Sequence, residues 1–367
     1  MTRGNANSFS IAALPGDGIG QEVMPAAMEV VDLVAGLQGF EVKWTPYPWS
    51  CEYYHQHGVM MPSDGLELLG REDAIFLGAV GDPSLPDHLS LWGLLIPIRR
   101  AFQQYINLRP ALLLPGVTSP LLDTSRGIDI LVVRENSEGE YSEVGGRVFP
   151  GTPDEMAVQE AIFSRKGTER AIEFAVDLAK KRSKRLVSAT KSNGIIHSMT
   201  FWDEVFNDVM ARHPDIHGQL MHVDALAARF ISHPHDLDVV VGSNLFGDIL
   251  TDIGAVIVGS MGMAPSANLN PSGQYPSMFE PVHGSAPDIV GKGVANPIGQ
   301  IWSAAMMFDH LGRPETHDLL MSAIRQVLGE TDIRTPDLGG VSSTVEVTEA
   351  VKEAVKANFQ GDARKET

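Results

Sequence analysis

The stretch LPGDGIGQEV, residues 14–23, marks the point where a short apolar strand turns into a helix. Residues 21–37 behind it repeat apolar side chains at helical spacing. Its three glycines, Gly16, Gly18 and Gly20, follow the pattern G-x-G-x-G, whereas the dinucleotide fingerprint requires G-x-G-x-x-G. A P-loop is excluded as well, because no Gly-Lys-Ser/Thr follows. The glycine spacing therefore favours a tight strand-to-helix turn over a Rossmann phosphate site.

The rest of the chain repeats this alternation of strand and helix. Helical patterns cover residues 155–182 and 199–212, between apolar runs with the character of strands. A Pro- and Gly-rich stretch, 262–297, shows little periodicity and is too long for an ordinary connector. The alternation predicts an α/β fold with a parallel or mixed sheet. The strand-like runs lie at residues 11–14, 74–80, 128–134, 185–191 and 237–245.

Composition narrows the class of protein. With 367 residues, 43% of them hydrophobic, the chain can bury a large core and is long enough for two domains. A net charge of −18 without any run of Lys and Arg argues against nucleic acid and anionic membranes as partners. We find no secretory signal in the first ten residues and no window that could span a membrane. The single cysteine, Cys51, excludes an internal disulfide, so we expect a cytoplasmic protein.

Two acids in NLFGDILTD, residues 244–252, are placed to share a cation. Asp248 and Asp252 are four residues apart, which puts both carboxylates on one face of a helix. Oxygen ligands of this kind suit Mg²⁺ or Mn²⁺ rather than zinc. A third acid, Asp224, also lies in apolar surroundings. A bare D-x-x-x-D is more often a solvated helix face, so the pattern leaves both a metal site and a solvated surface open.

Basic side chains and one tyrosine lie where the predicted strands end. Arg134 ends one strand-like run, and Arg99 and Arg109 lie ten residues apart. Guanidinium groups bind carboxylates bidentately, although a surface salt bridge is the default role of any single arginine. Lys191 ends another run; near a metal and arginines its pKa would fall and its amine could act as a base. Tyr141 could be the complementary acid.

Taken together, these segments resemble the β-decarboxylating dehydrogenase family, which includes isocitrate, isopropylmalate and tartrate/D-malate dehydrogenases. They occur in order from residue 11 to beyond residue 297, so the resemblance covers nearly the whole chain. It implies two α/β domains that share a mixed sheet, not a Rossmann fold. One is a discontinuous cofactor-binding domain, 1–105 plus 260–367; the other, 106–259, binds substrate and metal and forms the dimer. The matching segments are LPGDGIGQEV, NLRP, VVRENSEGEY, SATKSNG, VDALAARF, SNLFGDILTD and FEPVHGSAPDIVGKGVANP.

The resemblance also implies a role for each candidate residue. Lys191 would take the substrate's hydroxyl proton while NAD⁺ accepts hydride from C2, and Tyr141 would protonate C3 after CO₂ is lost. The family is homodimeric, so Lys191 and Asp224 would complete the neighbouring subunit's site. A need for a monovalent cation such as K⁺ is left open. The implied ligands of Mn²⁺ or Mg²⁺ are Asp224, Asp248 and Asp252, and the implied clamps on the substrate carboxylates are Arg99, Arg109 and Arg134.

For the cofactor, the resemblance points to HGSAPDIVGKGVAN, residues 283–296, as the adenosine-binding loop. Asn296 would contact the adenine edge. Asp288 would bind the ribose diol and repel the 2′-phosphate of NADP, so NAD is the expected cofactor. The cofactor-binding residues implied in this way are Ile19, His283, Gly284, Ser285, Ala286, Asp288 and Asn296.

The segment before Arg99, PDHLSLWGLLIPIRR, bears on the substrate. Trp92 would fill the space that an isopropyl group needs, and the segment resembles the tartrate/D-malate branch, which oxidises four-carbon 2-hydroxy diacids. Pro97 and Ile98 stand where that branch has a basic and an aromatic residue, which leaves the preferred substrate open. The alternatives are an isopropylmalate or isocitrate dehydrogenase and a non-catalytic regulatory subunit. The last is disfavoured because the implied acid, base and metal ligands are all present.

Overall fold

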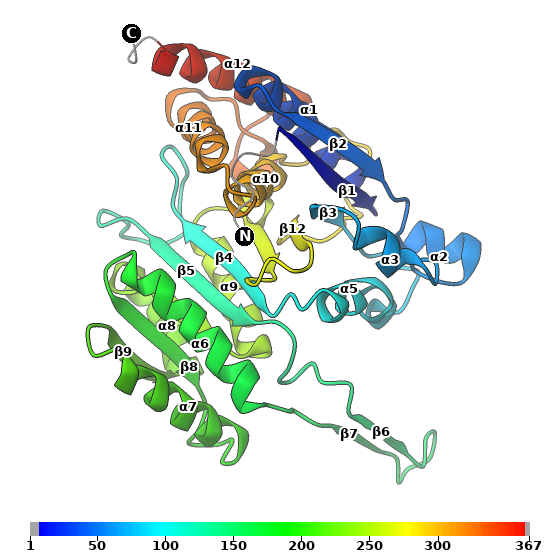
Figure 1. The fold of residues 1–367 in the computed structure, drawn as a ribbon, viewed down its shortest axis with the longest axis vertical. Coiled ribbons are helices and arrows are strands. Elements are labelled where there is room, and N and C mark those ends of the chain that lie inside the picture. Colours follow the sequence, from blue (N-terminus) through cyan, green and yellow to red (C-terminus); the bar gives the residue numbers. More distant parts are fainter. Residues whose placement is uncertain (1–6, 364–367) are drawn as a thin grey trace. The chain divides into compact units, whose positions relative to one another are not determined.

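The computed structural model describes residues 7–363, and the chain divides into two compact units. The first contains Met1–Gln104, Leu113–Leu122 and Ala255–Thr367. The second contains Tyr105–Leu112 and Asp123–Gly254. Both units combine strands with helices, as the alternating sequence pattern predicts (Figure 1).

The first unit is built on a sheet with the strand order β2–β1–β3–β12–β11. Its neighbours pair in parallel except β11 and β12, which are antiparallel. All six residues of β3 are buried, as expected for a central strand with helices on both faces. The strands are β1 (Ser8–Gly16), β2 (Glu41–Pro46), β3 (Ala74–Ala79), β11 (Pro265–Leu269) and β12 (Ser277–Pro281).

The first unit has four long helices, which pack on this sheet or on one another. Helix α1 contacts β1, β2 and β3, while α10 contacts β3, β11 and β12. Helices α11 and α12 pack against α10 and α1, respectively. The long helices are α1 (Gly20–Gln38), α10 (Ile298–His310), α11 (Pro314–Glu330) and α12 (Thr344–Ala363). The short ones are α2 (Cys51–His57), α3 (Gly65–Leu69), α4 (Asp87–Ser90), the π-helical turn η1 (Leu91–Leu95) and α5 (Ile96–Ala101).

The second unit has the strand order β4–β5–β10–β8–β9. Strand β4 is antiparallel to β5, and the remaining neighbours are parallel. Helix α6 covers β5, β10 and β8, and α7 packs on α6 and β8. The strands are β4 (Ile106–Leu112), β5 (Asp129–Glu135), β8 (Arg185–Thr190), β9 (His217–His222) and β10 (Val239–Gly242). The helices are α6 (Arg165–Lys180), α7 (Ser198–Arg212), α8 (Val223–Ser232) and α9 (Asn244–Ile257).

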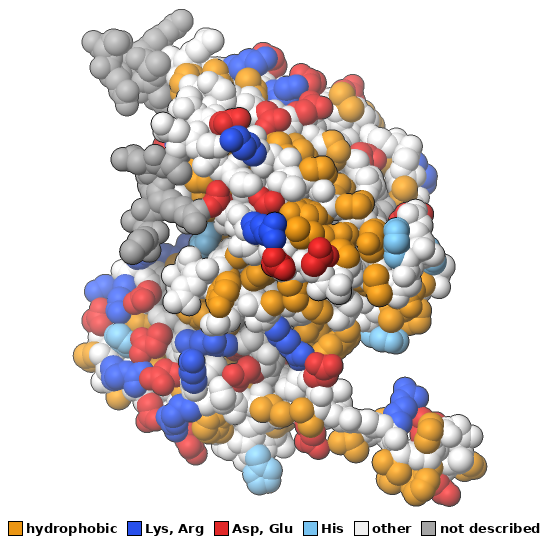
Figure 2. Space-filling model, turned by 45° about the vertical axis from the view of Figure 1, so that its right-hand side comes forward, with side chains coloured by type: hydrophobic (Ala, Val, Ile, Leu, Met, Phe, Trp, Pro, Cys, Tyr) orange, Lys and Arg blue, Asp and Glu red, His pale blue; other side chains and the backbone are white. Residues whose placement is uncertain are grey.

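A two-stranded arm projects from the second unit (Figure 1). It consists of the antiparallel strands β6 (Gly145–Val148) and β7 (Met156–Gln159), every residue of which is exposed. Apolar side chains nevertheless gather on the arm (Figure 2). The large exposed ones on and beside it are Val144, Val148, Phe149, Met156, Val158 and Ile162.

Three expectations from the sequence pattern are wrong in detail. The helical pattern 155–182 begins with strand β7, and α6 starts only at Arg165, where the Ser164 hydroxyl accepts a hydrogen bond from the Gly167 N–H at 2.9 Å. The run 237–245 is a strand only to Gly242, because α9 begins at Asn244. The stretch 262–297 contains β11 and β12, whose residues are all buried and therefore show no polar–apolar alternation.

The bounds predicted for the helices 21–37 and 199–212 agree within one residue with those of α1 and α7.

None of the helices in the described part of the chain is both long enough and apolar enough to cross a bilayer.

Candidate active site

The glycine turn between β1 and α1 rests on the loop 283–296. Gly16 and Gly18 have φ angles of 72° and 56°, in the left-handed region that favours glycine. A Cβ on Gly18 would lie 2.1 Å from the Ser285 carbonyl oxygen, so only glycine permits this approach. The next residue, Ile19, donates its backbone N–H to the same oxygen at 2.9 Å. The two segments that the resemblance assigns to the cofactor are thus in direct contact.

The loop 283–296 contains a buried acceptor without a partner. His283 Nδ1 lies 3.0 Å from the Gly284 carbonyl, to which it can only donate. Nε2 is then an acceptor, and it is buried with no hydrogen-bond partner among the described residues. Burial lowers the pKa of His283 and favours this neutral form. A buried ring acceptor of this kind fits a ligand with an N–H or O–H group, such as adenosine.

The other cofactor candidates differ in exposure. Asn296 is buried and its amide is fixed, because Nδ2 donates to Asp337 at 3.0 Å and Oδ1 accepts from the Ile298 N–H at 3.0 Å. Asp288 and Gly284 are exposed. Ala286 has a φ of 42° and packs against the buried cluster that contains Ile19, while Ser285 is buried.

Trp92 and Arg99 lie on the irregular helix of the first unit. Trp92 is in the π-helical turn η1, and the Arg100 guanidinium carbon lies 5.1 Å from its ring centroid. Pro97 lies in the first turn of α5, directly after η1, and its ring leaves no N–H to donate back into η1. Arg99 is buried and donates to Glu280 at 3.0 Å, while its Nε has no partner among the described residues. A buried guanidinium with an unused N–H fits a carboxylate ligand.

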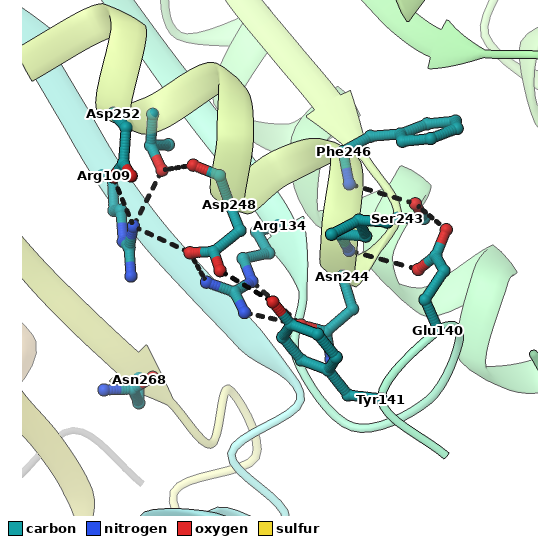
Figure 3. A network of polar contacts seen from close by, with 12 residues as sticks. Arg109, Arg134, Glu140, Tyr141, Ser243, Asn244, Phe246, Asp248, Asp252 and Asn268 are labelled. Carbon is teal, nitrogen blue, oxygen red and sulfur yellow. Dashed lines mark hydrogen bonds and ion pairs between the residues drawn. The ribbon is translucent and has the colours of Figure 1, made fainter. Parts of the chain in front are cut away.

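In the second unit the structure brings five of the predicted site residues together (Figure 3). Asp248 on α9 accepts hydrogen bonds from Arg109 at 3.3 Å and from Arg134 through one oxygen. Through the other it accepts from the Tyr141 hydroxyl at 3.0 Å. Asp252, one helical turn further along α9, lies 4.0 Å from Arg109. Two of the three predicted clamps, the predicted acid and two of the predicted metal ligands therefore form one network, whereas Arg99 lies in the first unit.

The electrostatics of this network suit a divalent cation. Burial and the neighbouring Asp248 carboxylate raise the pKa of Asp252. Burial and the charge of Asp248 also raise the pKa of Tyr141, which keeps its hydroxyl proton in place. Two carboxylates on one helix face repel each other, and an ion such as Mg²⁺ or Mn²⁺, which prefers oxygen ligands, would relieve that repulsion. The donor set therefore fits the metal that the resemblance implies.

Lys191 and Asp224 form a separate pair. Lys191 follows β8, Asp224 lies in the first turn of α8, and Nζ approaches the carboxylate to 2.9 Å. The hydrogen bond from Lys191 lowers the pKa of Asp224. The side chains are 31% and 67% exposed, respectively. Across residues 7–363, no three His, Cys, Asp or Glu side chains gather in a way that could hold a metal ion.

Several residues of the network were not predicted. Asn244 accepts from Arg134 Nε at 3.0 Å and from Nη2 at 2.6 Å, and the Thr251 hydroxyl accepts from Arg109 at 2.8 Å. Glu140 accepts from the Ser243 hydroxyl at 2.7 Å. The pair Ser-Asn before an apolar helix is a helix-start signal, which could have located this end of α9. No sequence signal pairs Arg99 with Glu280.

Known proteins resemble the chain over almost its full length. The profile of the family described as isocitrate/isopropylmalate dehydrogenase matches residues 10–354. A probable tartrate dehydrogenase/decarboxylase from Bacillus subtilis is 56% identical, over 94% of this chain and 97% of its own length. A decarboxylating D-malate dehydrogenase from Escherichia coli is 50% identical, over 94% of this chain and 98% of its own length.

Solved structures agree with this assignment. An isocitrate dehydrogenase from Methylococcus capsulatus superposes with a TM-score of 0.85 at 31% identity, covering 95% of this chain and 99% of the other. A β-decarboxylating dehydrogenase from Thermococcus kodakarensis gives a TM-score of 0.78 at 33% identity, covering 97% and 98%. The predicted fold class is confirmed. The chain belongs to the isocitrate/isopropylmalate dehydrogenase family, and it is an oxidoreductase of the decarboxylating dehydrogenase type.

Proposed function

We propose that this chain oxidises a small 2-hydroxy diacid, D-malate or tartrate, with NAD⁺ and a divalent metal, and removes the β-carboxylate as CO₂. The names of the relatives at 56% and 50% identity support this substrate class. The observation that carries the proposal is the network of Arg109, Arg134, Tyr141 and Asp248, since it combines anion-binding side chains, a proton donor and a carboxylate.

The residues supply most of the chemistry for D-malate. Arg109 and Arg134 hold carboxylate groups of the substrate through their guanidinium forks. Lys191 removes the C2 hydroxyl proton as hydride leaves C2, which converts the alcohol to a ketone. The C3–C4 bond then breaks, its electron pair remains on C3 and CO₂ leaves. Tyr141 delivers the proton to C3, and pyruvate is the product.

Two groups complete the site in this proposal. Asp248 and Asp252 hold Mn²⁺ or Mg²⁺, with Asp224 of a second copy as the third ligand. The turn at Ile19 and the loop 283–296 hold NAD. When bound, the metal stabilises negative charge that develops on the substrate oxygen, and NAD⁺ takes the hydride. In this assignment, 1–105 and 260–367 form the cofactor-binding domain, and 106–259 binds substrate and metal and forms the dimer.

The dimer is supported by exposed apolar surface on the second unit. Ile249 on α9 is 49% exposed, and Ile231 on α8 is 55% exposed. On the arm, Phe149 is 58% exposed and Met156 is 54% exposed. Large exposed apolar side chains that recur within one unit favour an interface between copies. A second copy placed there would bring its Lys191 and Asp224 to the Asp248 network, as the family resemblance implies.

Oxidation assays on the purified protein test the activity. We expect NADH and CO₂ in equal amounts from D-malate in the presence of Mn²⁺, and turnover of L- or meso-tartrate, with little activity on isopropylmalate or isocitrate. Faster turnover of isopropylmalate than of D-malate would contradict the substrate class and the space-filling role of Trp92. Lys191→Met should abolish NADH formation; if activity survives, Lys191 is not the base.

A further inference from the structure

Glu140, the residue before Tyr141, links the turn 138–141 to the start of α9 by hydrogen bonds. The Glu140 carboxylate accepts the Ser243 hydroxyl at 2.7 Å and the Leu245 backbone N–H at 3.1 Å (Figure 3). It therefore satisfies one of the N–H groups that every helix leaves unpaired in its first turn. Its negative charge also faces the positive end of the helix dipole.

A second contact holds the same turn in the same place. Asn244 Nδ2 donates to the Glu138 carbonyl at 3.2 Å. Gly139 between the two glutamates has a φ of 78°, which lets the chain reverse at this point. The turn 138–141 thus meets α9 at its first residues, while the Tyr141 hydroxyl meets Asp248 on the next helical turn.

This arrangement couples the phenol to the helix that presents Asp248 and Asp252. Tyr141 itself lies in an irregular segment between β5 and the exposed arm, so no strand or helix fixes its position. The Glu140 carboxylate fixes the preceding residue instead. The Asn244–Glu138 hydrogen bond and the backbone pairing of Gly139 with Ile162 would remain, so loss of the Glu140 contact would shift the turn rather than release it. A general acid displaced by about 1 Å loses up to about 100-fold in rate.

We propose that Glu140 is a positioning residue, which holds Tyr141 in register with α9 so that the phenol can deliver its proton to C3. The inference rests on the proposed function, because it takes Tyr141 as the acid. Glu140 does not transfer the proton itself, since both of its oxygens already accept hydrogen bonds from Ser243 and Leu245. Its effect on the reaction should therefore disappear when the phenol is removed.

The test compares Glu140→Gln, Tyr141→Phe and the double variant. Glu204→Gln is the matched control, since Glu204 is exposed on α7 in the same unit and undergoes the same change of charge. Exchange of the C3 hydrogens of pyruvate with D₂O, followed by NMR, isolates proton transfer because it requires neither hydride transfer nor CO₂ loss. NADH formation from D-malate and thermal melting are measured in parallel on the same samples.

We expect Glu140→Gln to slow the C3 exchange by about 10- to 100-fold with a KM for D-malate within about twofold of wild type. The double variant should be no slower than Tyr141→Phe alone. Hydrogen exchange by mass spectrometry on the free protein should show faster amide exchange in 138–142 and 243–247, because Glu140→Gln leaves only one acceptor oxygen for the two donors, the Ser243 hydroxyl and the Leu245 N–H. The control should match wild type in each measurement.

Three outcomes overturn the positioning role. They are equal C3 exchange in Glu140→Gln and Glu204→Gln, a further loss in the double variant, and unchanged amide exchange at the start of α9. If the first of these is accompanied by a lower melting temperature, Glu140 is only a structural cap of α9. A wild-type protein that neither exchanges pyruvate nor oxidises D-malate or tartrate refutes the proposed function instead, and amide exchange then decides the role of Glu140 by itself.

Discussion

Asp17, in the middle of the glycine turn, should be one of the most costly acids in the chain to remove. Its side chain is buried, and its carboxylate accepts backbone N–H groups from Cys51 at 3.1 Å, Glu52 at 3.3 Å and Gly81 at 3.0 Å. These contacts tie the turn to the start of α2 and to the segment after β3. Asp17→Ala would leave those N–H groups in a buried site without an acceptor.

The magnitude follows from the two shorter contacts. A hydrogen bond to a charged group contributes about 1.5–3 kcal/mol, so Asp17→Ala should lower the free energy of unfolding by about 3–6 kcal/mol. Asp17→Asn keeps one acceptor oxygen but turns an NH₂ group towards the remaining donors, and should cost about 2–3 kcal/mol. The assay is urea unfolding followed by circular dichroism. Asp64→Ala is the control, since Asp64 is exposed and makes no side-chain bond to α3. A loss below about 1 kcal/mol for Asp17→Ala would refute the reasoning.

Three other changes test separate parts of the structure. Gly18→Ala places a Cβ 2.1 Å from a carbonyl oxygen of the loop 283–296 and should raise the KM for NAD at least tenfold, measured by NADH formation; an unchanged KM would show that the turn does not shape the cofactor site. Chelation with EDTA should abolish turnover and Mn²⁺ should restore it, with Asp252→Asn needing at least tenfold more metal for half-maximal activity. Burial raises the pKa of Asp238, but the hydrogen bonds from Ser183 and Arg182 outweigh burial and hold that pKa below its usual value. Asp238 therefore stabilises the fold above its unfolded pKa of about 3.9, and this contribution is lost as pH falls through the lower folded value. Asp238→Asn should thus unfold at lower urea than wild type at pH 7, and the difference should shrink below about pH 4.

Local periodicity was enough to predict the helix that presents the two acids. Asp248 and Asp252 are four residues apart, and the structure places both on one helix, α9, because helical spacing depends only on neighbouring residues. The same reasoning predicted a strand over the whole run 237–245, whereas the strand in the structure ends at Gly242. The three consecutive valines Val239, Val240 and Val241 show no alternation, so periodicity alone cannot show where a buried strand ends and a helix starts.

Contacts between distant residues could not be predicted in this way. Glu280 balances Arg99 although 181 residues separate them, and no pattern in either segment points to the other. The buried, unpartnered Nε2 of His283 is equally invisible in the sequence, since its burial depends on how the loop 283–296 packs. The family resemblance supplied the roles of Arg99 and His283 but none for Glu280, whereas the pattern of apolar residues supplied only the order of the elements.

Four acids of this chain, Asp17, Glu140, Asp248 and Asp252, fall into two physical groups that composition does not separate. Asp17 and Glu140 accept backbone N–H groups at the starts of α2 and α9, so their charge is satisfied within the fold and is not available to a cation. Asp248 faces guanidinium and phenol groups, and Asp252 faces Asp248, so a cation can replace or supplement their partners. A net charge of −18 therefore does not indicate a metal site. What indicates one is two carboxylates whose neighbours are side chains rather than the backbone N–H groups of a helix start.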